Sequence, residues 1–235
     1  MSPTLFAVLA LVTFACAFIQ GAIGIGFALI FAPIVGFLKP DLLPVTLLLL
    51  MLPLNAHVAW RERSHIDWNG AGWITVGRFF GTFAGVWLLT VLSAQYLDVT
   101  VGVFTVTAAA AALIAPPFSP GRTSALGVGL FTGVTETATG IGGPPLALLY
   151  QHSKGPVLRA TVAMCFFVGE IMSLILLALT GRLGSEQLKW TLYLIPAVLL
   201  GSALSPMIHH RIGGNGLRMA VLLFSIVSGM LLILR

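Results

Sequence analysis

The feature that most constrains this chain is an apolar run from residue 5 to residue 38 that contains no charged side chain. As a single α-helix rising about 1.5 Å per residue, the run would be about 51 Å long, whereas the hydrocarbon core of a bilayer is about 30 Å thick. Gly21, Gly24 and Gly26 lie near its middle. We therefore expect two half-helices that meet at an unwound glycine turn, since glycine permits backbone conformations that interrupt a helix.

A second broken segment of the same kind is expected over residues 123–150. Its glycines are Gly133, Gly140, Gly142 and Gly143. Pro144 and Pro145 follow directly, and proline suits the first turn of a new helix because its missing N–H has no partner there anyway. The sequence thus predicts a second pair of half-helices, with the turn at residues 140–143.

Composition places the whole chain in a membrane. Hydrophobic residues make up 58% of the 235 residues and charged residues only 8%, whereas soluble domains carry about 25% charged residues. Twelve Lys and Arg with seven Asp and Glu cannot cover the exterior of a soluble fold of this length. The alternation typical of outer-membrane barrel strands is absent. We therefore predict an all-α, polytopic transmembrane helical bundle.

Charged or turn-rich loops divide the chain into eight apolar segments. They span about residues 5–38, 42–60, 70–92, 97–115, 123–150, 157–179, 188–208 and 217–234. The most turn-like linker, residues 116–122 (PPFSPGR), separates the first four segments from the last four. We expect a single integral membrane domain made of two transmembrane repeats, residues 1–115 and 123–235.

The repeat is visible at residue level. Residues 20–27 (QGAIGIGF) align with residues 136–143 (ETATGIGG) at an offset of 116, which is 136 minus 20. At the same offset Gly85 aligns with Gly201. Repeats of this kind mark the two halves of many secondary transporters, so duplication is favoured over a chance match.

The path of the broken segments decides how the two halves are oriented. If each segment crosses the membrane, the halves are parallel; if each turns back, the halves are inverted. The second arrangement puts Lys39, Arg182, Lys189 and Arg235 on the N-terminal side and Arg61, Arg63, Arg78, Arg122, Lys154, Arg159, Arg211 and Arg218 on the opposite side. Four basic residues against eight is a usable positive-inside bias, so inverted repeats of glycine-broken helical hairpins are favoured, with both termini on the outer, periplasmic side of the membrane.

The two glycine turns are candidate anion contacts. Backbone left unpaired at membrane depth is tolerated only where it is buried in protein or lines a watery cavity. A half-helix beginning at Phe27 or Pro144 would point free N–H groups and the positive end of its dipole at such a cavity. The candidate contacts are Gly24, Ile25, Gly26, Gly140, Ile141, Gly142, Gly143 and Pro144. The alternative is that the glycines only allow helices to pack closely.

Two glutamates are candidates for proton coupling. Glu136 lies deep within an otherwise uncharged stretch beside the second turn, and Gln20 is its counterpart in the first half. Glu170 lies about as deep in the next segment. An ionisable group at membrane depth is costly and is by default a functional hypothesis. The alternative for either glutamate is a neutral acid that hydrogen-bonds a neighbouring helix.

Other polar side chains could contact an anionic substrate. Arg78 and Arg159 lie in the first third of their segments, and Arg159 is preferred because it closely follows the second broken segment. Either arginine could instead extend to the interface and serve only as an orientation signal. Asn55 and Gln20 are further substrate candidates, although Asn55 could equally be an interhelical hydrogen-bonding group.

Several partners are disfavoured by the sequence. The histidines show no metal-ligand spacing, and no nucleotide-binding motif is present, so we expect no metal and no cofactor. The basic residues form no run, which argues against nucleic acid. Cys16 and Cys165 both lie inside apolar segments and are expected to be small buried hydrophobic residues rather than a disulfide.

These motifs resemble the TauE/SafE sulfite exporter family. The resemblance rests on the paired glycine turns, on residues 66–68 (IDW), on residues 140–145 (GIGGPP) and on residues 159–161 (RAT). It covers nearly the whole chain and implies a small permease of sulfur-containing anions in the bacterial inner membrane, driven by an ion gradient. The first turn departs from the family pattern because Phe27 stands where a further glycine is usual, which points to the second turn as the main contact.

We therefore expect a secondary transporter of a small anion, such as sulfite, a sulfonate or thiosulfate, that works by alternating access. Its partners are the anion, membrane lipids and a coupling ion, with the proton favoured. An anion channel is the alternative, since it would use the same half-helix ends. An intramembrane enzyme is disfavoured because its motifs are missing. The oligomeric state and the exact substrate stay open.

Overall fold

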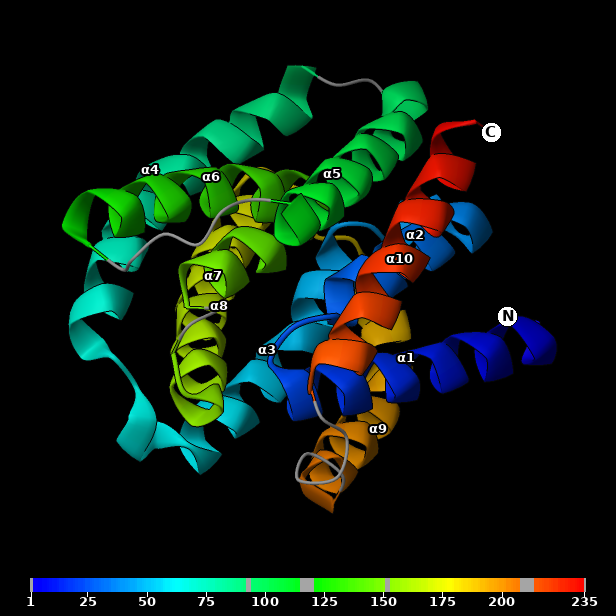
Figure 1. The fold of residues 1–235 in the computed structure, drawn as a ribbon. Coiled ribbons are helices and arrows are strands. Elements are labelled where there is room, and N and C mark those ends of the chain that lie inside the picture. The colour runs from blue at the N-terminus through cyan, green and yellow to red at the C-terminus, as the bar shows by residue number, and fades with distance from the viewer. Residues whose placement is uncertain (1, 92–93, 115–120, 151–152, 208–213, 235) are drawn as a thin grey trace.

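The computed structural model describes residues 2–91, 94–114, 121–150, 153–207 and 214–234. Within these ranges the secondary structure is helical and contains no strand (Figure 1). The α-helices are α1 (Pro3–Ile23), α2 (Phe27–Leu38), α3 (Val45–Arg61), α4 (Trp68–Val91), α5 (Ala94–Ile114), α6 (Arg122–Thr139), α7 (Gly143–Leu149), α8 (Gly155–Leu179), α9 (Ser185–Leu204) and α10 (Gly214–Ile233). Three short 3-10 helices join them: η1 (Pro40–Leu42), η2 (Arg63–His65) and η3 (Ser205–Met207). The all-α prediction is confirmed.

Four helices in the described ranges are long and apolar enough to cross a membrane. They are Pro3–Ile23, Trp68–Val91, Gly155–Leu179 and the continuous stretch Ser185–Met207. On the outer surface of α4, the large apolar side chains of Phe79, Phe80, Phe83 and Trp87 are all exposed. A row of large apolar side chains on the surface is suited to contact with lipid. Together with the four apolar helices of spanning length, it makes the fold that of a helical membrane bundle.

The first broken segment has the predicted glycine turn. Helix α1 ends at Ile23, and α2 begins at Phe27. Between them Gly24 has φ 95° and Gly26 has φ 126°, which are backbone conformations that glycine adopts without steric cost. The Gly24 N–H donates to the Gln20 carbonyl oxygen at 2.7 Å and so caps the end of α1.

The second broken segment repeats this geometry. Helix α6 ends at Thr139, and Gly140 has φ 82° with its N–H donating to the Glu136 carbonyl oxygen at 2.7 Å. The N–H of Ile141 donates to the Thr139 hydroxyl at 3.2 Å. Helix α7 then begins at Gly143, one residue before the predicted start at Pro144.

The α1–α2 segment turns back rather than crossing. Helix α1 runs parallel to α9, because the Phe6 ring near the start of α1 meets the Tyr193 ring in the middle of α9, and Gly21 near the end of α1 meets Ser205, directly after α9. Lys39, directly after α2, pairs with Glu186 in the first turn of α9 at 2.8 Å. The end of α2 therefore lies on the side of the bundle where α1 begins.

The α6–α7 segment turns back in the same way. Helices α6 and α4 run parallel, because Gly129 packs on the backbone of Ile74 and Gly85 packs against Thr137 further along. At the end of α7, the Tyr150 hydroxyl donates to the carboxylate of Asp67, which precedes α4, at 2.9 Å. Each broken segment is therefore a helical hairpin.

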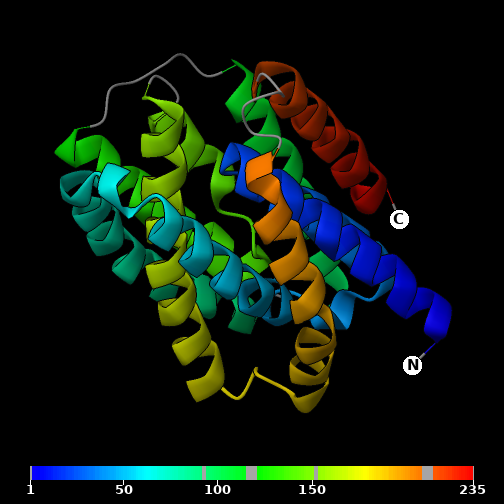
Figure 2. The same cartoon turned by 90° about the horizontal axis from the view of Figure 1, so that it is seen from below.

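The two halves of the chain are interlocked. The first helix of each half packs on a long helix of the other half, α1 on α9 and α6 on α4, and α5 lies beside α10 (Figures 1 and 2). Helices α3 and α8 run antiparallel, since Asn55 meets Glu170 midway and Glu62, after α3, meets Arg159 near the start of α8. The predicted linker, residues 116–122, lies almost wholly outside the described residues.

Candidate functional site

An arginine and a glutamate form an ion pair in the interior of the bundle. Arg78 Nη2 of α4 lies 2.8 Å from Glu136 Oε1 of α6, and both side chains are fully buried. The pair forms because α4 and α6 approach unusually closely. Glycines at 77, 81 and 85 of α4 face α6 backbone, and glycines at 129 and 133 of α6 face α4 backbone. Small residues at four-residue spacing allow such contact between membrane helices.

The ion pair leaves much hydrogen-bonding capacity unused. Among the described residues, Arg78 Nε and Nη1 have no hydrogen-bond partner, and neither do Glu136 Oε2 and Thr132 Oγ1. The Arg78 guanidinium lies 5.7 Å from the centre of the Phe166 ring. A buried polar group without a hydrogen bond is costly, so these atoms have donors and acceptors available for a further hydrogen-bond partner.

A chain of amide hydrogen bonds reaches the same region from the first broken segment. The N–H of Phe27, the first residue of α2, donates to Gln20 Oε1 at 3.0 Å. The Gln20 amide donates from Nε2 to Asn55 Oδ1 of α3 at 3.0 Å. The Asn55 amide in turn donates from Nδ2 to Glu170 Oε1 of α8 at 2.6 Å. Asn55 is therefore the interhelical hydrogen-bonding residue that one reading of the sequence predicts.

The chain and the ion pair belong to one buried cluster. The Arg78 guanidinium lies against Gly169, in the space that a side chain at position 169 would occupy. Glu170, the next residue, interacts electrostatically with Glu136 and Arg78. Gly142 of the second turn packs directly on the Glu136 carboxylate. Five helices, α1, α3, α4, α6 and α8, thus bring together the cluster of Gln20, Asn55, Arg78, Glu136 and Glu170.

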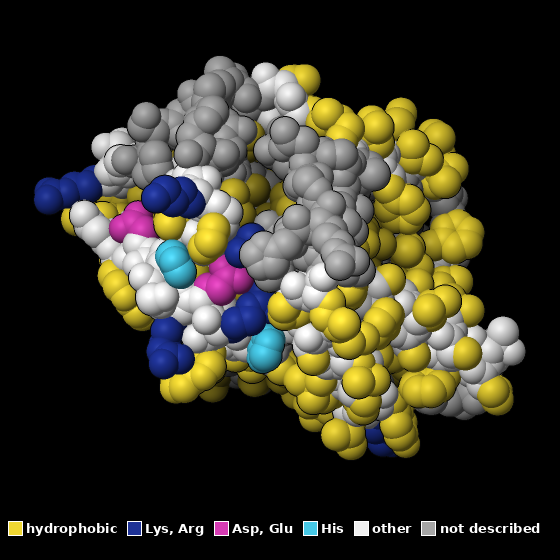
Figure 3. Space-filling model, turned by 60° about the horizontal axis from the view of Figure 1, so that its bottom comes forward, with side chains coloured by type: hydrophobic (Ala, Val, Ile, Leu, Met, Phe, Trp, Pro, Cys, Tyr) yellow, Lys and Arg dark blue, Asp and Glu magenta, His cyan; other side chains and the backbone are white. Residues whose placement is uncertain are grey.

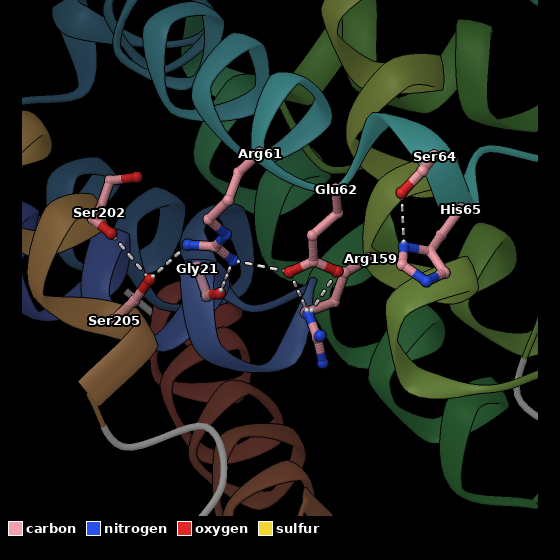
Figure 4. A network of polar contacts seen from close by, with 8 residues as sticks. All are labelled: Gly21, Arg61, Glu62, Ser64, His65, Arg159, Ser202 and Ser205. Atoms are coloured by element: carbon pink, nitrogen blue, oxygen red, sulfur yellow. Dashed lines mark hydrogen bonds and ion pairs between the residues drawn. The ribbon is translucent and has the colours of Figure 1, made fainter.

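Arg159 lies in a second polar network, at one end of the bundle (Figure 4). Its Nε lies 3.0 and 3.1 Å from the two carboxylate oxygens of Glu62. Arg61 contacts the same carboxylate at 2.9 Å, donates to the Gly21 carbonyl oxygen at 3.0 Å and to Ser205 Oγ at 3.3 Å. The Arg159 stem also packs on Gly24 of the first turn. This end network ties the first turn to α3, α8 and η3.

The end network belongs to the charged face of the molecule. Figure 3 shows Lys, Arg, Asp, Glu and His side chains gathered on one face, whereas much of the other described surface in that view is hydrophobic. Exposed basic residues at the end where α4, α6 and α8 begin include Arg63, Arg122 and Lys154. Lys39, Arg182 and Lys189 lie at the opposite end, beside the start of α9. The described surface is thus charged at the two ends of the bundle and mainly apolar between them.

The comparison with sequence families decides the identity. The sequence model described as sulfite exporter TauE/SafE matches residues 9–232. The chain belongs to the TauE/SafE sulfite exporter family. The resemblance predicted from the paired glycine turns is therefore confirmed, and this TauE/SafE protein is a membrane transporter of anions in general. Searches of the curated proteins and of the solved structures each found no match.

In this TauE/SafE chain the predicted site residues divide into three groups. Gln20, Asn55, Arg78, Glu136 and Glu170 form the buried cluster, while Arg159 lies in the end network with Gly24. The remaining residues are Ile25, Gly26, Gly140, Ile141, Gly142, Gly143 and Pro144, and all of them are buried at the two turns. The two turns lie near each other, since a Cβ atom at Gly143 would lie 3.8 Å from the Ile25 side chain.

Some contributing residues were not predicted from the sequence. The Arg78 guanidinium packs against Gly169, and the Glu62 carboxylate forms an ion pair with Arg159. A glycine directly before a membrane-depth glutamate was an available signal for Gly169. Glu62 had none, because a charged residue in a loop between two apolar segments is ordinary. In the described residues no group of His, Cys, Asp and Glu could hold a metal ion.

Proposed function

We propose that this protein is a proton-coupled secondary transporter of a small oxyanion that contains sulfur, such as sulfite, a sulfonate or thiosulfate. The observation that carries the proposal is Arg78: a fully buried guanidinium whose Nε and Nη1 have no hydrogen-bond partner among the described residues. Ionisable groups at membrane depth mark substrate and ion pathways. Family membership supports an anion as the substrate, and the description of the family as sulfite exporters supports sulfite.

The chemistry of the guanidinium favours an oxyanion over a halide. Its planar fork of N–H donors matches two oxygens of one ligand at once. Sulfite, sulfonates and thiosulfate each present several oxygens on one sulfur. Arg78 contacts Glu136 Oε1 only through Nη2, which carries two hydrogens. One edge of the guanidinium, Nη2 together with either Nε or Nη1, therefore remains for such a ligand. Arg159 would be an earlier contact, because it is partly buried near the charged face.

Proton coupling would come from Glu136. The Glu136 carboxylate and a transported anion would both interact with the Arg78 guanidinium. Two negative charges beside one buried cation leave one negative charge uncompensated, which is costly. A proton taken up by Glu136 removes that charge when the anion binds. The anion and the proton would then move together. Gly142, which rests on the Glu136 carboxylate, would pass the change to the second turn.

Alternating access would use two inverted repeats, which we propose are residues 1–115 and 123–235. The antiparallel pair α3 and α8 and the reciprocal contacts of α1 with α9 and α6 with α4 support this arrangement. In such transporters one half moves against the other around a central site. By the positive-inside rule, the end with Arg61, Arg63 and Arg159 would face the cytoplasm of a bacterial inner membrane and the termini the periplasm.

Counterflow in proteoliposomes tests the function. Purified protein is reconstituted with unlabelled sulfite, thiosulfate or methanesulfonate inside, and uptake of the same labelled anion is followed. A carrier is accelerated by anion on the far side and a channel is not, so acceleration supports the transporter. Arg78→Gln should abolish the uptake, and Arg63→Gln, an exposed arginine outside both networks, is the matched control. An unaffected Arg78→Gln variant would refute the proposed role of Arg78.

The coupling role of Glu136 has its own measurement. Glu136→Gln should leave anion binding measurable by calorimetry, because the glutamine stays neutral beside Arg78. Uptake driven by an imposed pH gradient should be lost, while exchange of anion for anion persists. A Glu136→Gln protein that still responds fully to the pH gradient would assign proton coupling to another residue.

A further inference from the structure

The hydrogen-bond chain that ends at Glu170 has a direction set by the backbone. The Phe27 N–H can only donate, so the Gln20 atom that faces it is the amide oxygen. The Gln20 amide nitrogen must then donate to the Asn55 oxygen. This leaves the Asn55 amide nitrogen as the donor to Glu170 Oε1. One backbone group, freed by the first glycine turn, thus makes Oε1 of Glu170 an acceptor.

The second oxygen of Glu170 is different. Glu170 is fully buried, and its Oε2 has no hydrogen-bond partner among the described residues. A proton on Oε1 would point at the Asn55 amide hydrogens, which already occupy that position. A proton carried by Glu170 therefore resides on Oε2, where it makes an unused hydrogen-bond donor.

Charge balance says which carboxyl group carries a proton. The charged and titratable groups around the cluster are Arg78 of α4, Glu136 of α6, and Glu170 and Cys165 of α8. One cation against two ionised carboxylates would leave a net negative charge on fully buried side chains, which is strongly unfavourable. Glu136 contacts the guanidinium at 2.8 Å, whereas Glu170 is held by a neutral amide. The neutral member of the pair of carboxyls is therefore Glu170.

We propose that Glu170 is a permanently neutral acid that donates its Oε2 hydrogen to the transported oxyanion beside Arg78. The proposal rests on the proposed function and deepens it by assigning a second recognition group. Gln20 and Asn55 act as positioning residues, because they hold Oε1 as an acceptor and so present the proton on Oε2. A neutral donor strengthens oxyanion binding without adding a charge, and it leaves Glu136 as the coupling group.

Two near-isosteric substitutions of Glu170 separate this role from proton release. Glu170→Gln keeps an acceptor toward Asn55 and places an N–H donor where Oε2–H was. Glu170→Leu removes both. Counterflow of sulfite and of thiosulfate should stay within a few-fold of wild type in Glu170→Gln, at mildly acidic and mildly alkaline pH alike. In Glu170→Leu the affinity should fall about tenfold or more, as expected when a hydrogen bond to a charged ligand is lost.

Each outcome of these experiments either supports the role of Glu170 as a neutral donor or contradicts it. If Glu170→Gln is as defective as Glu170→Leu while wild type transports, Glu170 must release its proton and the proposal is wrong. If wild type itself moves none of these anions, the proposed function fails first. Should Glu170→Leu not fold, infrared spectroscopy in lipid still tests the proposal: the wild type should show a protonated carboxylic acid C=O band that vanishes in Glu170→Gln, where Arg78 and Glu136 keep their pairing. A band absent from the wild type would overturn the proposal.

Discussion

The guanidinium of Arg78 in α4 rests on the backbone of Gly169 in α8, in the space that a Cβ atom at 169 would fill. Arg78 cannot move away without leaving Glu136, which it contacts at 2.8 Å in a fully buried position. A glycine directly before Glu170 therefore sets the depth and direction of the only buried arginine that the described residues contain.

The first prediction concerns this contact. Gly169→Ala should displace the guanidinium and reduce anion counterflow strongly, and it should lower the free energy of unfolding in detergent by about 1–3 kcal/mol, the usual cost of overpacking. Gly72→Ala in α4 is the control, since nothing lies within 4 Å of a Cβ at that position. Equal counterflow and equal stability of the two variants would mean that the Arg78 guanidinium can function from a different position.

The second prediction concerns the Arg78–Glu136 ion pair. Removing one partner leaves an unpaired buried charge, so Arg78→Met and Glu136→Gln should each destabilise the fold, by up to about 3–5 kcal/mol. The double variant should lose clearly less than the sum of the two. Thermal and denaturant unfolding of all four proteins in the same micelles measures the coupling free energy, and strict additivity would show that the two groups do not interact in the folded state.

The third prediction concerns the amide chain. Gln20→Leu leaves the Phe27 N–H and the Asn55 oxygen buried without partners. Each loss costs about 1–3 kcal/mol, so the variant should be destabilised, and its glycine turn should open more often. Hydrogen exchange at Phe27 followed by mass spectrometry reports this locally. Exchange there that matches wild type would mean that the Phe27 N–H finds another acceptor.

The fourth prediction separates backbone strain from crowding at the first turn. Gly24 and Gly181 both have left-handed φ, 95° and 70°, but only Gly24 is crowded, by Leu158 and Arg159. Gly181→Ala should cost about 1–2 kcal/mol through its backbone alone. Gly24→Ala should cost more and should also impair transport. Denaturant unfolding and counterflow of both variants, side by side, make the comparison, and a smaller loss at Gly24 would contradict it.

The fifth prediction concerns Arg159 at the charged face. Arg159→Gln should raise the KM for anion uptake from that face and leave the maximal rate nearly unchanged, because a charge at the rim of a site chiefly assists the approach of its ligand. High salt should shrink the difference from wild type, since it screens charges near the surface. A loss of maximal rate that salt does not alter would instead place Arg159 in the central binding step.

The sequence by itself determined the class of fold and the position of the two glycine turns. A chain with so few charged residues and such long apolar runs cannot fold as a soluble protein. Glycine readily adopts the positive φ at which a helix ends inside the membrane. Gln20, Asn55, Arg78, Glu136 and Glu170 could also be singled out, because each is a polar group at a depth where polarity is costly.

Only the tertiary structure decided which of these residues meet. The sequence favoured Arg159 over Arg78 for the anion, since Arg159 is nearer to the second turn along the chain. The close glycine packing of α4 on α6 instead pairs Arg78 with Glu136, and the antiparallel packing of α3 on α8 joins Asn55 to Glu170. Such pairs depend on how far helices approach and in which register, and these quantities arise from contacts between segments distant in the chain.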